Sequence, residues 1–247
     1  MANDVRQYRV TLTTIEPFRI GALQNVLSGL DNPVATVGGR VVVQGSTLKG
    51  ALRAEIERHL IENYASDDVM KPCIPSAANT LSPEEQKLID KGVYRPGGGC
   101  TYSMRRKSPS ICPVCYLLGA QGLPGFVRVP YLFTETPPED LYSVRQDRAT
   151  GVVAERTNRD YQIMPDGTVF GGLLEVLFAD AGRRWKLGEH RFNEDKWVGS
   201  GKWDAGKIIE EFVIARLQAI DVVGGFKSKG CGKVSIEVEE IVGATSG

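Results

Sequence analysis

Four stretches of the chain have the apolar pattern of β-strands. In the first and the last of them, apolar and polar residues alternate, which is typical of a strand with one face on the core. The stretches are Val5–Thr14, Phe126–Phe133, Thr168–Phe178 and Lys233–Val242. A shorter extended piece is expected at Arg40–Val43. The pattern therefore predicts a sheet of at least four strands.

Two longer stretches predict helices. They run from about Thr47 to Glu62 and from about Ala205 to Ile220. In the first, Leu48 and Leu52 begin an apolar face at helical spacing. Ser46 directly precedes this helix and is a suitable N-cap, because its hydroxyl can accept a hydrogen bond from a free backbone N–H.

In chain order these elements are strand, helix, strand, strand, helix, strand. This is the order of the α+β ferredoxin-like (RRM-like) fold, in which two helices cover one face of an antiparallel sheet. A chain of 247 residues fits one large domain or two small ones. We predict a single domain, 1–247, that carries two insertions, 65–125 and 142–165.

The first insertion, 65–125, is rich in proline, glycine, serine and charge, and holds four of the five cysteines. Cys112 and Cys115 are separated by two residues, a spacing that suits one tetrahedral ion. Cys73 and Cys100 can complete a four-thiolate zinc site, and such an ion would hold together a segment with little apolar core. The alternative is four free thiols. His59 could replace one thiolate, although a partly buried helix residue is its more ordinary role.

Charge and hydrophobicity exclude some classes of protein. Thirty basic residues balance thirty acidic ones, so any polyanion must be bound by local patches and not by the field of the whole protein. The sequence has no apolar run of membrane-spanning length, and its N-terminus lacks the apolar core of a signal peptide. We expect a cytoplasmic protein with no membrane partner, whose cysteines are reduced or metal-bound.

A loop near the C-terminus, 222–234, combines four glycines with three lysines. Glycine permits positive φ and close approach of a ligand to the backbone, and successive free N–H groups form an anion-binding concavity. Gly225, Lys227 and Lys229 are therefore candidates to hold the phosphates of a nucleic acid. The alternative is a tight helix-to-strand connection with solvated lysines.

Two other regions have the composition of anion contacts. Ser46 and Lys49 lie at a predicted helix N-terminus, where free N–H groups and the helix dipole favour a phosphate. In the second insertion, Tyr161 is available for stacking and four arginines could follow a phosphate backbone. These arginines are Arg145, Arg148, Arg156 and Arg159. The alternatives are a capped helix and a hairpin, both with solvated charges.

Asp31 stands in the turn-forming sequence Asp-Asn-Pro. As a turn residue it would bond to its own backbone. As a catalyst, a carboxylate on an exposed loop could hold a divalent metal or activate a hydroxyl. A further catalytic motif, Ser-x-x-Lys at Ser46 and Lys49, is discounted because the Ser-Asp-Asn and Lys-Thr-Gly tripeptides of β-lactamase-like enzymes are absent from the sequence.

Three motifs occur in order along the chain. The first runs from Gly29 through Asp31 to Arg53 and contains Gly-Ser-Thr-Leu-Lys-Gly; the second, Asp147–Phe170, contains Asp-Arg-Ala-Thr-Gly and Pro-Asp-Gly-Thr; the third is Gly224–Val234. Together they resemble the RAMP superfamily of CRISPR proteins, and in particular the RNA-cleaving backbone subunits of type III effector complexes (the Csm-three-like, Cas-seven group). The resemblance covers most of the chain outside 65–125.

The resemblance implies a subunit that stacks with copies of itself and with other CRISPR effector subunits along a guide RNA. Arg53 joins Ser46, Lys49, Gly225, Lys227 and Lys229 as a guide contact, and 142–165 becomes a thumb hairpin that opens the guide–target duplex. Asp31 becomes the carboxylate that cleaves target RNA with a divalent metal such as Mg²⁺, and 65–125 a segment with structural zinc. Lys229 stands where the family usually has arginine, which gives up a bidentate phosphate contact.

Two alternatives stay open within this resemblance. Some such subunits bind RNA without cutting it, so the chain could be a non-catalytic, guide-RNA-binding structural subunit. A guide-processing endonuclease of the same superfamily would want a histidine near its active site. The chain's two histidines, His59 and His190, are poorly placed for that, and His190 is expected to be a solvated surface residue.

Overall fold

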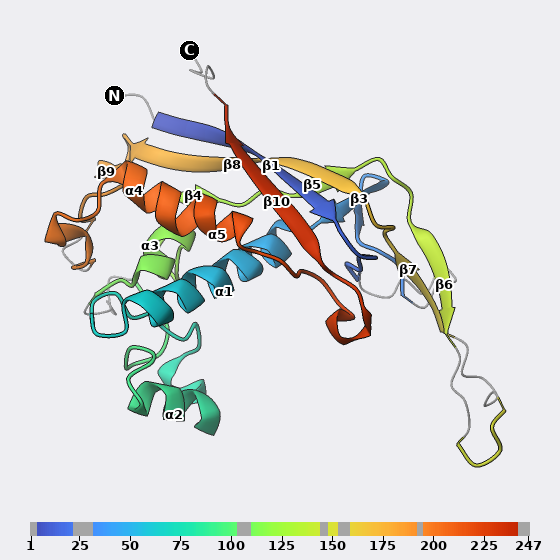
Figure 1. The fold of residues 1–247 in the computed structure, drawn as a ribbon. Helices are drawn as coiled ribbons and strands as arrows, with labels where there is room; N and C mark the ends of the chain where they lie inside the picture. Colours follow the sequence, from blue (N-terminus) through green and yellow to red (C-terminus); the bar gives the residue numbers. More distant parts are fainter. Residues whose placement is uncertain are drawn as a thin grey trace.

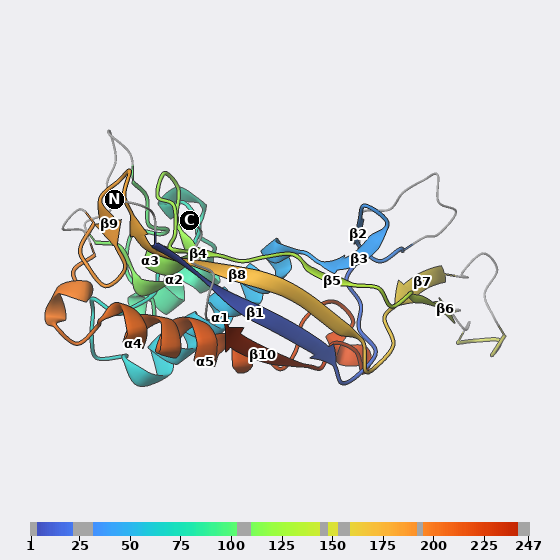
Figure 2. The same ribbon diagram turned by 90° about the horizontal axis from the view of Figure 1, so that it is seen from above.

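The computed structural model describes residues 4–21, 32–102, 110–143, 148–152, 159–191 and 195–241. Figures 1 and 2 label the strands and helices within these residues. The strands are β1 (Asp4–Thr14), β2 (Thr36–Val37), β3 (Arg40–Val43), β4 (Val127–Arg128), β5 (Leu132–Thr134), β6 (Glu139–Ser143), β7 (Arg159–Ile163), β8 (Val169–Asp180), β9 (Trp185–Lys186) and β10 (Val234–Glu240). The helices are α1 (Gly45–Asn63), α2 (Pro83–Asp90), α3 (Pro113–Leu118), α4 (Ala205–Ile209) and α5 (Ala215–Gln218), with a π-helical segment, Glu210–Ile214, between α4 and α5.

The main sheet has the strand order β10-β1-β8-β5-β3-β2, and β4 and β9 also pair with β8. The paired strands run antiparallel. β1 and β8 lie side by side in this sheet, between β10 and β5. The helices α1 and α4–α5 lie on one face of the sheet (Figure 1). This mixed α+β architecture agrees with the predicted ferredoxin-like arrangement.

An apolar core lies between this sheet and the helices. Val10 and Leu12 of β1 are fully buried, as the alternation along this strand predicts. Leu48 and Leu52 of α1 are buried in the same cluster, which also contains Phe212 of the π-helical segment. The central strand and the two helical segments are thus fixed to one another by apolar burial.

The stretch Phe126–Phe133, predicted as one strand, forms two short strands, β4 and β5. Pro130 lies between them and has no N–H to donate to a neighbouring strand. The chain also passes close to two glycines here. A Cβ on Gly45 would lie 2.9 Å from the Val129 carbonyl oxygen, and a Cβ on Gly172 would lie 2.6 Å from that of Tyr131. The start of α1 and the middle of β8 therefore both need glycine at these positions.

The prediction that Ser46 is the N-cap of the first helix is wrong. α1 begins at Gly45, its N-cap residue is Gln44, and no side chain caps it. β3 ends at Val43, so the chain enters the helix at once, and Gly45 is the residue small enough to pass the neighbouring carbonyls. Ser46 is instead the second residue of the helix.

The second predicted helix contains one irregular turn. Asp204 caps α4 by accepting a hydrogen bond from the Lys207 N–H at 2.9 Å. The π-helical turn that follows brings Glu211 toward α1, where its Oε1 accepts a hydrogen bond from the Tyr64 hydroxyl at 2.6 Å and lies 2.9 Å from His59 Nε2. Within the described residues, none of the helices is long and apolar enough to cross a membrane.

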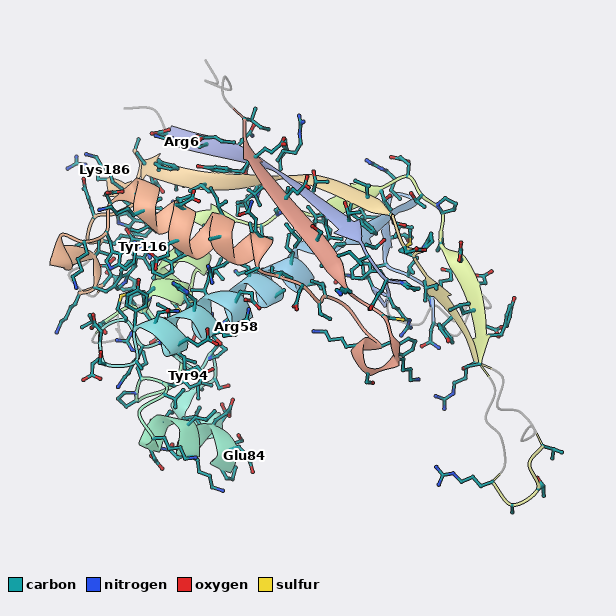
Figure 3. All side chains as sticks on the ribbon, in the orientation of Figure 1. Arg6, Arg58, Glu84, Tyr94, Tyr116 and Lys186 are labelled. Atoms are coloured by element: carbon teal, nitrogen blue, oxygen red, sulfur yellow. The ribbon has the colours of Figure 1, made fainter. Side chains whose placement is uncertain are left out.

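The segment 65–125 contributes more to the core than its composition suggests. α2 begins with the capping box that Ser82 and Glu85 form, and it lies below α1 at the lower edge of Figure 1. α3 is buried along its whole length. Its Tyr116 packs edge to face on Trp197 with ring centroids 5.1 Å apart, and it is labelled among the crowded side chains in Figure 3. The segment, including its cysteines, is therefore stabilised by packing in the apolar core.

A separate two-stranded hairpin, β6 with β7, projects from one end of the main sheet (Figure 2). The predicted hairpin begins at residue 142, whereas β6 begins at Glu139. The register pairs Leu141 with Tyr161. The tip of the hairpin lies partly outside the described residues.

Candidate functional site

Segments from three parts of the sequence meet where the hairpin joins the sheet. Asn32 forms a parallel bridge with Tyr161, and its carbonyl accepts the Gln162 N–H at 3.0 Å. The Gln162 side chain, in turn, accepts a hydrogen bond from the Val34 N–H at 3.3 Å. The residue that follows Asp31 is therefore attached to β7. Asp31 itself lies outside the described residues.

Phe226 brings the glycine-rich loop to the same place. Its ring meets that of Tyr161 edge to face, with 5.3 Å between centroids. Two cations face the Phe226 ring: the Arg19 guanidinium carbon lies 4.5 Å from the centroid, and Lys229 Nζ lies 4.7 Å from it. The aromatic ring thus holds two positive charges beside the hairpin.

Hydrogen bonds and glycines fix the shape of this loop. The Gly225 N–H donates to the Arg19 carbonyl at 2.9 Å, and the Gly232 N–H donates to the Pro17 carbonyl at 3.0 Å. Gly224 and Gly232 have φ of 89° and 101°, and a Cβ on either would lie within 2.5 Å of a carbonyl oxygen. Phe226 also has a positive φ, 61°, which is unusual for a large side chain. These hydrogen bonds and close approaches therefore fix the backbone conformation of the loop.

A groove of about 450 Å³ separates the loop from α1. Its floor on the helix consists of small side chains, Thr47, Gly50, Ala51 and Ala54. The groove also borders Arg19, Gly225 and Lys227, so two cations and a backbone with glycine lie along it. Its walls can accept a negatively charged chain of modest width.

Ser46 and Lys49 line a different groove. This second groove, of about 740 Å³, lies on the other side of α1, next to the segment Leu118–Tyr131, and includes Arg128 and Tyr131. The sequence prediction placed Ser46 and Lys49 among the same guide contacts as Gly225 and Lys227. The structure separates the two pairs by the width of the helix, so any anion that touches both must pass over the N-terminal turns of α1.

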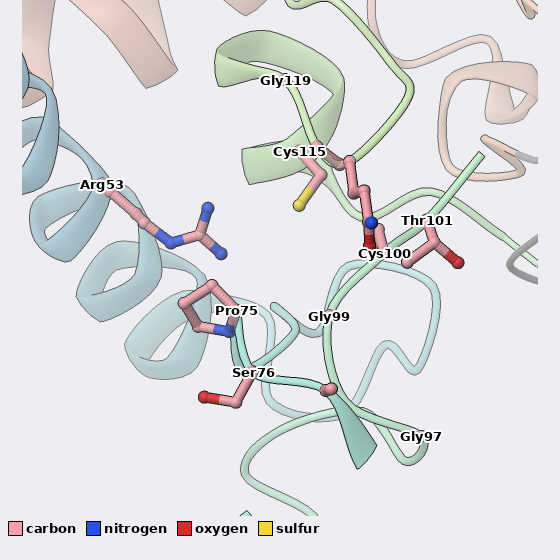
Figure 4. A pocket seen from close by; sticks show the side chains of 12 residues that line it. Arg53, Pro75, Ser76, Gly97, Gly99, Cys100, Thr101, Cys115 and Gly119 are labelled. Carbon is pink, nitrogen blue, oxygen red and sulfur yellow. The ribbon is translucent and has the colours of Figure 1, made fainter. Parts of the chain in front are cut away.

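Arg53 is engaged elsewhere. It extends from α1 toward the cysteines (Figure 4), donates to the Cys73 carbonyl at 3.3 Å, and its Nε lies 2.7 Å from Glu57 Oε1. Burial opposes its charge, but the Cys115 sulfur and the Glu57 carboxylate keep the pKa of Arg53 above its ordinary value. These contacts favour a role at the cysteines over the predicted guide contact.

The four cysteines Cys73, Cys100, Cys112 and Cys115 converge as the sequence predicts. Their Sγ atoms all lie within 4.8 Å of one another, and each of the four residues is buried. Cys73 Sγ lies 3.4 Å from Cys115 Sγ and 3.6 Å from Cys112 Sγ. A tetrahedral zinc site with metal–sulfur bonds near 2.3 Å has sulfur–sulfur distances of about 3.8 Å. The set therefore could hold one metal ion such as zinc.

Of the predicted arginines in the hairpin, Arg148 and Arg159 are described and exposed, whereas Arg145 and Arg156 lie outside the described residues. His59 is a partly buried helix residue bonded to Glu211, as expected, and is not in the cysteine cluster. His190 is exposed, as expected, with 38% of its side chain accessible. Its Nδ1 lies 3.2 Å from Oδ1 of the buried Asp195.

Sequence reasoning missed Arg19 and the structural role of Phe226. Arg19 stands after the first strand, far in sequence from the loop whose groove it borders. A single aromatic residue among four glycines and three lysines was a signal for Phe226, because a loop of that composition has few other groups with which to organise its charges.

Comparison with known proteins gives a family. No curated protein matches the chain. The family model of the RAMPs, the RAMP superfamily, matches residues 11–235, a range that includes all three motifs and most of the 247-residue chain. The matched range also contains the groove, the hairpin and the cysteine cluster. The chain therefore belongs to the RAMP superfamily.

Proposed function

We propose that this protein is a guide-RNA-binding backbone subunit of a CRISPR effector complex of the type III kind, and that it cleaves target RNA. Membership of the RAMP superfamily supports a CRISPR-associated RNA-binding module in general. The finer proposal is that several copies lie along one guide RNA together with other effector subunits, in the cytoplasm.

The observation that carries the proposal is the meeting of three segments at Tyr161. Tyr161 lies on β7, and Asn32 and Phe226 are distant from it in sequence. Asn32 nevertheless bridges to Tyr161 and accepts a hydrogen bond from the Gln162 N–H, and the Phe226 ring packs against the Tyr161 ring. These are the segments that carry the resemblance to the RNA-cleaving subunits. A guide–target duplex held there would meet the loop, the hairpin and the carboxylate loop together.

In this proposal the guide backbone follows the groove between the glycine-rich loop and α1. Lys227 and Arg19 would meet its phosphates, and the small side chains of Gly50 and Ala54 would let the backbone approach the helix closely. Ser46 and Lys49 would meet a neighbouring stretch of the guide from the second groove. Base pairing between guide and target, and not the protein, would supply the sequence specificity.

The β6–β7 hairpin would act as the thumb. Its exposed Arg148 and Arg159, with Arg145 and Arg156, would follow the phosphates of the opened duplex. Opening frees a target nucleotide from helical geometry, so its 2′-hydroxyl can align with the adjacent phosphate. Asp31 would orient that hydroxyl or a divalent ion such as Mg²⁺, which supplies charge stabilisation when bound.

The cysteine cluster would hold a structural zinc ion. The donor set fits, since four buried sulfur atoms lie at nearly tetrahedral spacing and α3 presents two of them. Four protein ligands leave no open position for a substrate, which is typical of a structural and not a catalytic site. The ion would hold together the separate parts of 65–125 that supply its four ligands.

The test of the proposed function is the nucleic acid that the protein carries. The native complex should be purified under low and high salt and its RNA extracted and sequenced. We expect RNAs that share the repeat-derived sequence of a CRISPR array, and release at high salt because phosphate contacts dominate. A complex that carries no RNA, or only random cellular RNA, would rule out guide binding.

A further inference from the structure

Two arginines contact the cysteine cluster at two different sulfur atoms. Arg53 Nη2 lies 3.7 Å from Cys73 Sγ while it donates to the Cys73 carbonyl. Arg95 Nη1 lies 3.6 Å from Cys100 Sγ and donates to the Ser110 carbonyl at 2.9 Å. Each guanidinium thus bonds both to a sulfur and to a nearby carbonyl, which fixes its position.

We propose that Arg53 and Arg95 are positioning residues of the metal centre, which hold the Cys73 and Cys100 sulfurs and offset the negative charge of four thiolates. A divalent ion bound by four thiolates carries two net negative charges. The cysteines are at most 5% exposed, and burying such a charge without partners is strongly unfavourable. Two guanidinium groups supply positive charge at the point where it is needed.

The two sulfurs differ from the other pair in how they are held. Cys112 and Cys115 lie on consecutive turns at the start of α3, and Cys112 Sγ accepts the Cys115 N–H at 3.4 Å. The spacing of that pair is fixed by the helix. Cys73 and Cys100 belong to loops, so contacts from other segments hold their sulfurs: Cys100 Sγ accepts a hydrogen bond from the Cys112 N–H at 3.5 Å, and the two arginines contact Cys73 and Cys100. Arg53 comes from α1 and Arg95 from the loop after α2.

Glu57 fixes the orientation of Arg53. Its Oε1 lies 2.7 Å from Arg53 Nε, one helical turn away, and both side chains are less than 20% exposed. With Nε facing Glu57, Nη2 faces Cys73. The carboxylate adds a negative charge, and burial raises the pKa of Glu57 despite the opposing charge of Arg53. Glu57 therefore fixes the orientation of the Arg53 guanidinium, although a buried carboxylate near the cysteine sulfurs is itself electrostatically unfavourable.

A consequence is that the metal centre is attached to α1. Arg53 lies one helical turn after Lys49, which borders the second groove, and Arg53 itself borders the cysteine pocket, a small cavity that Cys100 and Cys115 also line (Figure 4). The helix that borders both candidate RNA grooves thus contacts the metal centre through one side chain. This inference rests on the zinc centre of the proposed function.

The test uses the full chain and measures metal affinity directly. Zn²⁺ is titrated in competition with a chromophoric chelator, and Co²⁺ is bound in its place so that the thiolate-to-cobalt bands report the ligand geometry. The variants are Arg53→Met, Arg53→Lys, Arg95→Met and the double Met variant. The matched control is Arg58→Met, since Arg58 also lies on α1 and pairs with Glu55 but is 56% exposed (Figure 3).

We expect Arg53→Met and Arg95→Met each to weaken Zn²⁺ binding by about 10- to 100-fold and to shift the Co²⁺ bands, because outer contacts orient metal ligands. The Zn²⁺ affinity of Arg53→Lys should lie between those of the wild type and Arg53→Met, since lysine keeps the positive charge but lacks the several N–H donors of the planar guanidinium. The double variant should bind more weakly than either single one, and Arg58→Met should match the wild type.

Two contrary results have different meanings. If the wild type binds tightly but both Met variants bind within about twofold of it with unchanged cobalt bands, the positioning role is overturned and the metal centre stands. If the wild type binds neither Zn²⁺ nor Co²⁺, the zinc centre itself is overturned. Should Arg53→Met fail to fold, Arg95→Met decides alone, because its side chain lies outside α1.

Discussion

The rings of Tyr161 and Phe226 meet edge to face with 5.3 Å between their centroids. Tyr161 belongs to β7 of the hairpin and Phe226 to the glycine-rich loop. Because Asn32 bonds to β7 at the same point, this contact joins the hairpin, the loop and the segment that follows Asp31. A perturbation at either ring should therefore affect both the local fold and RNA binding.

Replacement of Phe226 should separate these two effects. Phe226→Ala removes the ring that organises Arg19 and Lys229, and we expect it to weaken binding of single-stranded RNA by about tenfold, which corresponds to the loss of roughly one cation–π contact. Phe226→Gly removes the same ring but relaxes the positive φ, so its unfolding free energy should exceed that of Phe226→Ala by about 1 kcal/mol. Filter binding and urea unfolding measure the two quantities. Wild-type affinity in both variants would contradict the role of the ring.

The arrangement of α1 illustrates how far the sequence could lead. Helical spacing correctly predicts that Leu48, Leu52 and Ile56 face the core. Ser46 and Lys49 border the second groove, and Arg53 borders the adjoining pocket that Cys100 and Cys115 line. What faces these residues is set by tertiary packing of a distant segment, and periodicity carries no information about it.

Glycines in the loop should differ in their tolerance of a methyl group. A Cβ on Gly232 would lie 2.5 Å from the Val223 carbonyl oxygen, whereas one on Gly230 meets nothing within 4 Å, and both residues have positive φ. Gly230→Ala should therefore lower the unfolding free energy only by the strain of a non-glycine residue at positive φ, about 1 kcal/mol. Gly232→Ala should cost clearly more, because the backbone must also move. Urea unfolding of the two variants tests this, and equal losses would show that the close approach is unimportant.

Removal of the metal should loosen 65–125. Cys115→Ser takes away a ligand, and we expect it to lower zinc content, to lower the unfolding temperature and to speed proteolysis within this segment. Cys231→Ser is the matched control, because Cys231 is partly exposed and is not in the cluster. Metal analysis and limited proteolysis give the readouts. The α3 packing around Tyr116 should preserve part of the segment's structure even without metal, so complete unfolding is not expected.

The link between α1 and the π-helical turn should respond to alkaline pH. Burial and the hydrogen bond to Glu211 raise the pKa of Tyr64 to about 12, whereas in the unfolded chain it is near 10. The folded state therefore holds this proton more tightly, and its stabilising effect is complete below about pH 10 and is lost as the pH rises toward 12. Tyr64→Phe should reduce the decline of unfolding free energy between about pH 9.5 and 11.5. Identical slopes for the two proteins would contradict the assignment.

Other elements were beyond the sequence for identifiable physical reasons. The break between β4 and β5 follows from Pro130 and from the passage of carbonyls over Gly45 and Gly172, a relationship between three separate segments. Arg19 could not be found because its groove is completed by the loop that contains Lys227. Half of the cysteine cluster was predictable from a local pattern, the two-residue spacing of Cys112 and Cys115, whereas the approach of Cys73 and Cys100 depends on the tertiary fold.

Asp31→Asn tests whether the subunit cuts RNA. The change keeps the size of the side chain and removes the negative charge that would orient a hydroxyl or a divalent ion. We expect cleavage of a complementary target by the assembled complex to fall by at least about 100-fold in Mg²⁺, while target affinity stays the same, because a positioned acid or base typically contributes that much. Asp90→Asn is the control, since this exposed carboxylate at the end of α2 accepts a hydrogen bond from Gln86 of the same helix and is not part of the proposed RNA-binding site. Equal cleavage by Asp31→Asn and the wild type would reassign the catalysis to another residue. A wild-type complex that binds target but does not cut it in any divalent metal would mean that the subunit serves as a non-catalytic scaffold for the guide.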